Sequence, residues 1–355
     1  MKKSRYLCIA LCSAMMFTAC SSNSQSSASA SSAVSQSSAS SEVSQSSVPD
    51  PAAASQSSAV AKLAFVDLDD QISIDEDEVP LASAPISSNL TPVASGVTVY
   101  NNDKAKIDAS NTSDGYIMVA FTGSAKGKLK VIVTGPSGVK YTYDLTSNGS
   151  YEVFPLSDGN GNYSIGIYEN VSGNKYSTVF TQDISVKLKS EFAPFLLPNQ
   201  YVNFNASSKT VAKAEELTVG CSTDLDKITN VYNYVVENIS YDKQKAATVQ
   251  SGYLPNVDSI LASKKGICFD YADVMTAMLR SQGIPCKLVI GYAGTAYHAW
   301  INAYTKENGW VDNVILFDGK TWKLMDPTFA SSANKSDSIM QYIGNGANYS
   351  AKYLY

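Results

Sequence analysis

Residues 266–292 read GICFDYADVMTAMLRSQGIPCKLVIGY. The apolar side chains in the first half of this stretch recur with helical spacing, and Gly283 is a favourable residue to follow a helix end. The pattern predicts a helix that begins near Cys268 and ends before Gly283. Its inner-facing side chains are expected to be Ala272, Met275, Thr276 and Leu279. The following apolar residues, 287–292, are predicted to form a strand.

Three residues in this part of the chain suit thiol chemistry. The predicted helix places Cys268 at its N-terminus, where unpaired amide groups and the helix dipole stabilise a thiolate. His298 is the only histidine of the chain, and Asp326 follows it. A thiol nucleophile needs an imidazole to activate it and a carboxylate or amide to orient the imidazole. Cys268, His298 and Asp326 are therefore the candidate catalytic residues.

The surrounding pattern is mixed α and β. Thr223 or Asp224 can cap a helix that runs through Glu237. Further strands are predicted at 298–304, 313–317 and 321–325, the last two joined by a tight turn at Asp318-Gly319. If these strands are neighbours in one sheet, the His298 imidazole and the Asp326 carboxylate can meet. A single histidine excludes metal sites of the multi-histidine type, so neither a metal nor a cofactor is expected.

The blocks around the three residues resemble the transglutaminase-like superfamily. These blocks are residues 266–272, 278–285, 291–292, 298–300 and 326–328. The resemblance covers residues 191–355 and implies an α+β fold, in which a helix bearing Cys packs against an antiparallel sheet bearing His and Asp. It implies a papain-like triad with Cys268 as nucleophile, His298 as general base and then acid, and Asp326 as the orienting carboxylate. The chain has no acidic calcium-binding cluster of the animal enzymes, which argues against crosslinking.

Three aromatic residues are candidates for supporting roles in the site. The stretch 238–242 resembles the block of that family that precedes the nucleophile, so Tyr241 is a candidate oxyanion donor, with packing as the equal alternative. Trp300 and Trp322 are candidates for the walls of the substrate pocket, with simple packing as the preferred role of each.

Two aspartates and two further cysteines have expected structural roles. Asp270 and Asp273 are expected to cap the start of the helix. Cys221 and Cys286 either form a disulfide or remain two buried thiols, and their spacing does not decide between the two.

The middle of the chain is all-β. Residues 62–190 are assigned to an immunoglobulin-like β-sandwich, because short alternating runs are separated by Gly-rich turns at the usual spacing. The predicted strands cover residues 115–122, 128–134, 140–145, 151–156, 163–168 and 176–186.

The N-terminus has the features of an export signal. Residues 1–19 combine basic residues with a short apolar run, and Thr18-Ala19-Cys20 resembles the lipobox of bacterial lipoproteins, which implies lipidation of Cys20. Residues 20–61 are rich in Ser and are expected to be a disordered spacer. The protein is therefore expected to be exported and lipid-anchored on the outer face of the cell membrane. The net charge of −5 argues against nucleic acid as a partner.

The leading functional interpretation is a cysteine-dependent acyl-transfer enzyme at the cell surface. It would hydrolyse a peptide or isopeptide bond in a protein or cell-wall peptide, through a thioester. One alternative is a protein-crosslinking transamidase, in which an amine replaces water. Another is a catalytically inert binding or scaffold module.

Overall fold

The computed structural model describes residues 91–306, 309–311 and 349–355. The predicted signal peptide, spacer and lipidation site at Cys20 lie outside these residues. So do the strands predicted at 313–317 and 321–325, and with them Trp322 and Asp326. No helix within the described ranges has the length and apolar character needed to cross a membrane.

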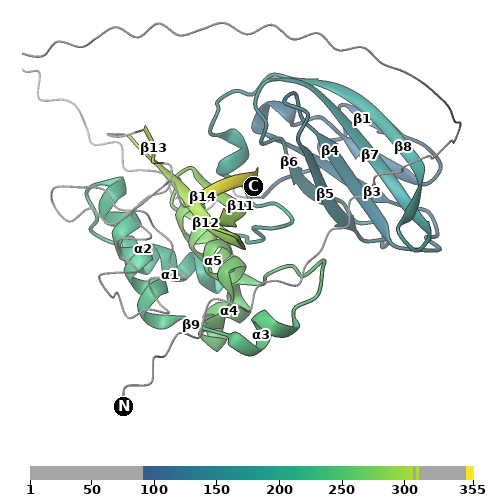
Figure 1. Cartoon of the computed structure of the whole chain (residues 1–355). Helices are drawn as coiled ribbons and strands as arrows, with labels where there is room; N and C mark the ends of the chain where they lie inside the picture. The colour runs from purple at the N-terminus through teal and green to yellow at the C-terminus, as the bar shows by residue number, and fades with distance from the viewer. Residues whose placement is uncertain (1–90, 307–308, 312–348) are drawn as a thin grey trace, which may run out of the picture. The chain divides into compact units, whose positions relative to one another are not determined.

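The N-terminal part is a β-sandwich of two antiparallel four-stranded sheets (Figure 1). One sheet has the order β1 (Val99–Asn101), β2 (Ala105–Asp108), β3 (Tyr116–Phe121), β6 (Glu152–Pro155). The other has the order β5 (Lys140–Leu145), β4 (Leu129–Thr134), β7 (Gly161–Ser172), β8 (Lys175–Val186). The chain changes sheet after β3, β5 and β6, as in immunoglobulin-like sandwiches. The six predicted strands are confirmed, whereas β1 and β2 were not predicted.

The C-terminal part is an α+β domain. Its helices are α1 (Lys209–Thr218), α2 (Asp224–Asn238), α3 (Lys243–Thr248), α4 (Val257–Ser263) and α5 (Cys268–Ser281). Its main sheet has the order β13 (Gly309–Val311), β12 (Ala296–Thr305), β11 (Cys286–Ala293), β14 (Tyr349–Leu354), with antiparallel pairs throughout. A small parallel pair joins β9 (Ser240–Tyr241) to β10 (Lys265–Gly266).

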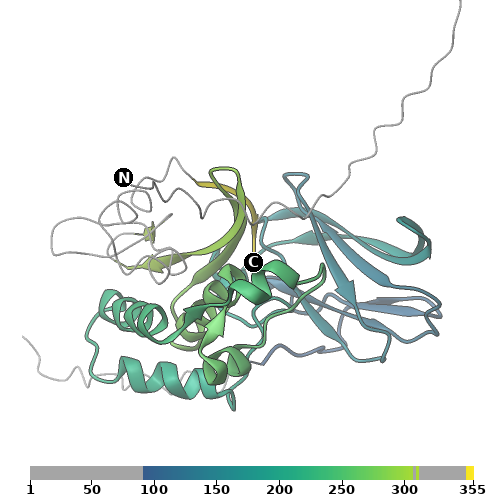
Figure 2. The same ribbon diagram turned by 60° about the horizontal axis from the view of Figure 1, so that its bottom comes forward.

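Helix α5 is the central element of this domain. Every residue from Asp270 to Ser281 is buried, because α5 packs against α1, α2 and α4 as well as against β11 and β12 (Figure 2). The predicted inner face is therefore correct, but the helix is enclosed on its other sides too. Gly283 ends the helix in the left-handed conformation (φ 74°), and the Ile284 amide donates to the Leu279 carbonyl.

Buried Arg280 ties three distant segments to α5. Its guanidinium donates from Nε to the Cys286 carbonyl (2.9 Å), from one terminal nitrogen to the Leu197 carbonyl (2.7 Å) and from the other to the Tyr355 carbonyl (2.6 Å). Burial lowers the pKa of Arg280 to about 10. The guanidinium still carries its charge at neutral pH and binds the dipoles of three backbone carbonyls.

Tyrosine rings join the sandwich to the α+β domain. Tyr141 and Tyr143 of β5 contact the Tyr355 ring, with centroids 5.6 and 5.9 Å apart. Tyr201 contacts both Tyr143 (5.3 Å) and Tyr355 (4.5 Å). We call Tyr141, Tyr143, Tyr201 and Tyr355 the tyrosine cluster. It packs β5 against the segments that precede α1 and follow β14.

Candidate active site

Cys268 is the first residue of α5 and is half-buried. The predicted position at a helix N-terminus is therefore confirmed, and the first turn of an α-helix has amides without partners inside the helix. Gly266 makes this entry possible, because a Cβ atom at this position would lie 2.6 Å from the Cβ of Asp270. The chain thus approaches the helix more closely than any side chain at position 266 would permit.

Tyr241 lies beside the strand that leads into Cys268. In the parallel pair β9–β10, Tyr241 is in register with Gly266, and the Asp242 amide donates to the Gly266 carbonyl (2.9 Å). Tyr241 is half-buried and packs against the core. This neighbourhood suits both the oxyanion assignment and the packing alternative.

His298 is in β12, which packs against α5. It pairs in register with Gly291 of β11 and is 7% exposed. Its ring stacks against Trp300, with centroids 6.4 Å apart and planes inclined by 21°. Trp300 is only 1% exposed and meets Tyr349 edge-on, so its burial favours the packing alternative over an open pocket wall.

Sequence reasoning missed two tyrosines of the β11–β12 hairpin, one on each strand. Tyr297 and Tyr292 contact one another across the β11–β12 hairpin (5.6 Å) and are 39% and 40% exposed. Burial, Tyr353, Tyr292 and the Cys268 thiol together raise the pKa of Tyr297 to about 12. No local pattern indicated this contact, because it depends on the register of the β11–β12 hairpin, which pairs Tyr292 with Tyr297.

A charged cluster holds the first turn of α5. Asp270, 0% exposed, accepts hydrogen bonds from the Ile267 amide (2.8 Å), the Tyr253 hydroxyl (2.6 Å) and the Lys245 ammonium (2.5 Å). The Ile267 bond caps the helix, as predicted for Asp270. Lys245 comes from α3 and Tyr253 from the segment between α3 and α4, and neither was predicted to lie here.

Residues 211–313 match the family model of the Transglutaminase-like superfamily. This chain contains a transglutaminase-like domain. The matched range includes Cys268 and His298 and ends before Asp326. The sequence is also similar to the uncharacterized protein YebA of Bacillus subtilis strain 168, at 26% identity over 196 residues. That match covers 48% of this chain and 26% of YebA, so it spans about a quarter of the relative's length.

Two solved structures show weak similarity. A candidate cysteine protease from Cytophaga hutchinsonii is 14% identical, with 73% of each chain covered and a TM-score of 0.35. A candidate protease from Parabacteroides distasonis is 12% identical, with 58% of this chain and 62% of that chain covered and a TM-score of 0.25.

Asp273 of the transglutaminase-like domain does not cap α5, contrary to the prediction. It lies beyond the first turn, where the helix amides already have partners. It is fully buried, and neither carboxylate oxygen has a hydrogen-bond partner among the described residues. Burial raises the pKa of Asp273 well above its ordinary value, and the nearby Asp270 carboxylate raises it further, while Arg280 opposes both. The buried site therefore favours the neutral, protonated form of Asp273 over the carboxylate.

The raised pKa of Asp273 should make the stability of the fold depend on pH. Because the folded pKa is raised, its contribution to stability is complete below the unfolded value of about 3.9 and is lost as pH rises through the folded pKa. The Asn variant has no such proton. We expect Asp273→Asn to gain stability relative to wild type by up to about 1.4 kcal/mol per pH unit above pH 4, until the folded carboxyl ionises. Urea unfolding of both proteins at pH 5, 6, 7 and 8 measures the difference, and a constant difference would contradict the assignment.

The structure also describes Cys221 and Cys286, the two cysteines outside the candidate site. Cys221 and Cys286 are free thiols, which agrees with the alternative of two unpaired cysteines. Cys286 is buried next to the Thr276 hydroxyl (3.7 Å), and burial raises the pKa of its thiol to about 11. Within the described ranges, no group of three or more His, Cys, Asp or Glu side chains is placed to hold a metal ion.

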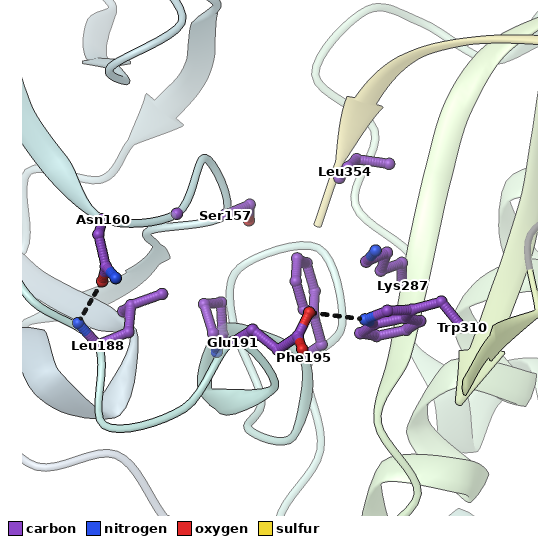
Figure 3. Close-up of a pocket in the computed structure, with 10 residues that line it drawn as sticks. Ser157, Asn160, Leu188, Glu191, Phe195, Lys287, Trp310 and Leu354 are labelled. Carbon is purple, nitrogen blue, oxygen red and sulfur yellow. Dashed lines mark hydrogen bonds between the residues drawn. The ribbon is translucent and has the colours of Figure 1, made fainter. Parts of the chain in front are cut away.

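A pocket of about 230 Å³ lies apart from the cysteine (Figure 3). In it the Lys287 ammonium sits 3.6 Å from the centroid of the Trp310 ring, and the Trp310 indole nitrogen donates to Glu191 (3.3 Å). Sandwich residues such as Ser157 line its other side. Neither Cys268 nor His298 contributes to its lining, so it is separate from the candidate nucleophile.

Proposed function

We propose that this protein is a cysteine-dependent acyl-transfer enzyme that hydrolyses a peptide or isopeptide bond. The observation that carries the proposal is the position of Cys268 at the N-terminus of α5, which packs against the strand bearing the only histidine of the chain. The transglutaminase-like domain over residues 211–313 supports the same chemistry. In the proposed triad Cys268 is the nucleophile, His298 the base and Asp326 the orienting carboxylate.

The reaction proceeds in two halves. The Cys268 sulfur attacks the amide carbonyl carbon, a C–S bond forms, and the C–N bond breaks as protonated His298 gives its proton to the leaving amine. Water then attacks the thioester while His298 accepts its proton. A C–O bond forms, the C–S bond breaks, and the carboxylic acid leaves with the thiol restored. The Cys268 backbone amide and the Tyr241 hydroxyl are the proposed donors to the oxyanion in both halves.

The proposed setting is the outer face of the cell membrane. It is supported by the signal-like residues 1–19, by the lipobox-like Cys20 and by the Ser-rich residues 20–61, which would give the folded part reach from the membrane. Stable anchoring needs more than one acyl chain, as a lipidated N-terminal cysteine can provide. The proposed substrates are therefore surface proteins or cell-wall peptides.

The test is to incubate the protein with a surface proteome or with cell-wall peptides in H₂¹⁸O, with and without an added primary amine. Mass spectrometry should find new carboxyl ends that carry ¹⁸O, a thioester adduct on Cys268 and no products from Cys268→Ala. Amine-capped products in place of ¹⁸O-labelled ends would identify a transamidase instead. Full binding of surface material without an adduct or product would identify a binding module.

A further inference from the structure

The charged cluster holds the first turn of α5, the turn that begins with the candidate nucleophile. Asp270 is two residues after Cys268, and its carboxylate is fully buried. Three donors surround it, namely the Ile267 amide, the Tyr253 hydroxyl and the Lys245 ammonium, at 2.8, 2.6 and 2.5 Å. The Lys245 ammonium also donates to the Tyr253 hydroxyl (2.6 Å), which closes a ring of three side chains. Of these donors only Lys245 carries a charge.

A buried carboxylate at this position works against a thiolate. The helix N-terminus favours negative charge on Cys268, but a second negative charge in the same turn disfavours it. A hydrogen bond from a neutral amide or hydroxyl leaves the charge of Asp270 in place. The Lys245 ammonium cancels it at contact distance, in a site where solvent screens little.

Other ionisable groups lie on α5 itself, on the elements next to it and on the segment before α1. They are Asp273 on α5, Tyr201 before α1, Tyr297 and His298 on β12, and Tyr241, Asp242 and Lys265 on or beside β9–β10. Burial favours the neutral form of Asp273, as described above. Burial raises the pKa of Tyr201, and burial with the bond to Asp270 raises the pKa of Tyr253, so both phenols are neutral as well. Lys265 is exposed to solvent, which screens its charge.

We propose that Lys245 is a positioning residue that neutralises Asp270, so that this buried carboxylate does not oppose formation of the Cys268 thiolate. The proposal rests on the proposed function, in which that thiolate is the nucleophile. The same pair fastens α3 and the segment that follows it onto the entrance of α5. Lys245 thus controls the ionisation of the thiol through Asp270 without touching the substrate.

The test follows the ionisation of Cys268 directly, without a substrate. The rate of alkylation by iodoacetamide is measured from pH 5 to 10, with the Cys268 peptide quantified by mass spectrometry. We expect Lys245→Met to move the midpoint of the pH profile upward by about 1 pH unit, the usual size for a nearby like charge. Lys245→Arg should keep the wild-type midpoint, because it keeps the charge. Lys243→Met, an exposed change on the same helix, is the matched control and should leave the midpoint unchanged.

Removing the carboxylate charge should reverse the effect. The double variant Lys245→Met with Asp270→Asn should return the midpoint to near the wild-type value. Asp270→Asn alone should lower it, because the Lys245 charge then has no partner, and this variant tests the proposal even if Lys245→Met fails to fold. An unchanged midpoint in folded Lys245→Met, or in Asp270→Asn, overturns the proposal. Failure of the proposed function would instead show as absent turnover in a wild-type protein whose midpoints still move with these charges.

Discussion

Cys268→Ala is expected to lower kcat/KM on a cleaved substrate by at least about 10⁴, because the covalent step has no other nucleophile. The thiol is half-buried at the first position of α5, and Ala is the most favourable helix residue. The fold should therefore survive, and the melting temperature should stay close to that of the wild type. Residual activity near the wild-type level in a folded variant would contradict the nucleophile assignment.

Substitutions of Asp326, the third proposed triad member, should lower activity by intermediate amounts. Asp326→Ala should cost less than Cys268→Ala, roughly 10²–10⁴ in kcat/KM, because it leaves the nucleophile and only misplaces the imidazole. Asp326→Asn should be milder, since an amide oxygen still accepts a hydrogen bond from the imidazole N–H. Kinetics of the three variants beside their melting curves measure the order. Full activity in Asp326→Ala would remove Asp326 from the triad.

Arg280→Ala is expected to destabilise the protein by about 3–5 kcal/mol, enough to unfold many domains. Its guanidinium satisfies buried carbonyls of Cys286, Leu197 and Tyr355, which come from three different segments. A buried carbonyl left without a donor costs about 1–3 kcal/mol, although the Tyr355 carbonyl keeps the Leu288 amide as a donor. The removed side chain also leaves a cavity beside α5.

Urea unfolding at neutral pH measures this change in the free energy of unfolding. Arg280→Lys should recover only part of the loss, because one ammonium cannot reproduce the fork of the guanidinium. Lys213→Ala, which removes an exposed ion pair with Glu216, is a control that should leave stability unchanged. A loss below about 1 kcal/mol for Arg280→Ala would contradict a structural role for the fork.

Local patterns were sufficient to predict much of this fold. Helix α5 and strands β11 and β12 follow from apolar periodicity and from Gly283, and the sandwich strands follow from alternation between turn residues. Helix α2 begins at Asp224 and is capped by Thr223, one of the two caps that the sequence indicated. These features depend on residues within a few positions of one another.

Contacts between distant segments could not be predicted in this way. Strand β14 follows the range 211–313 in the sequence, yet it pairs with β11 inside that range. Alternation alone does not indicate which strands pair. The Lys245–Asp270 pair and the carbonyl partners of Arg280 join segments that only the packed fold brings together. Asp273 was misassigned because the preference of acidic residues for a helix start applies to its first turn alone.

The candidate site, like the fold, could be predicted only in part from the sequence. Cys268 and His298 could be nominated because the chain has one histidine and because the cysteine precedes a periodic stretch. The assignment of Asp326 depends on the family resemblance, and Asp326 lies outside the described residues. The exposed pair Tyr292 and Tyr297 had no such signal, since their meeting depends on the register of the β11–β12 hairpin.

The tyrosine cluster limits how freely the two folded parts can be recombined. Tyr141 and Tyr143 of the sandwich meet Tyr201 and Tyr355 ring against ring. A different sandwich grafted in front of residue 191 would leave two large rings facing a surface shaped for other partners. Evolution could exchange the sandwich only together with compensating changes at Tyr201 and Tyr355. Although the two folded parts look like separate modules, the side chains at their contact have to change together.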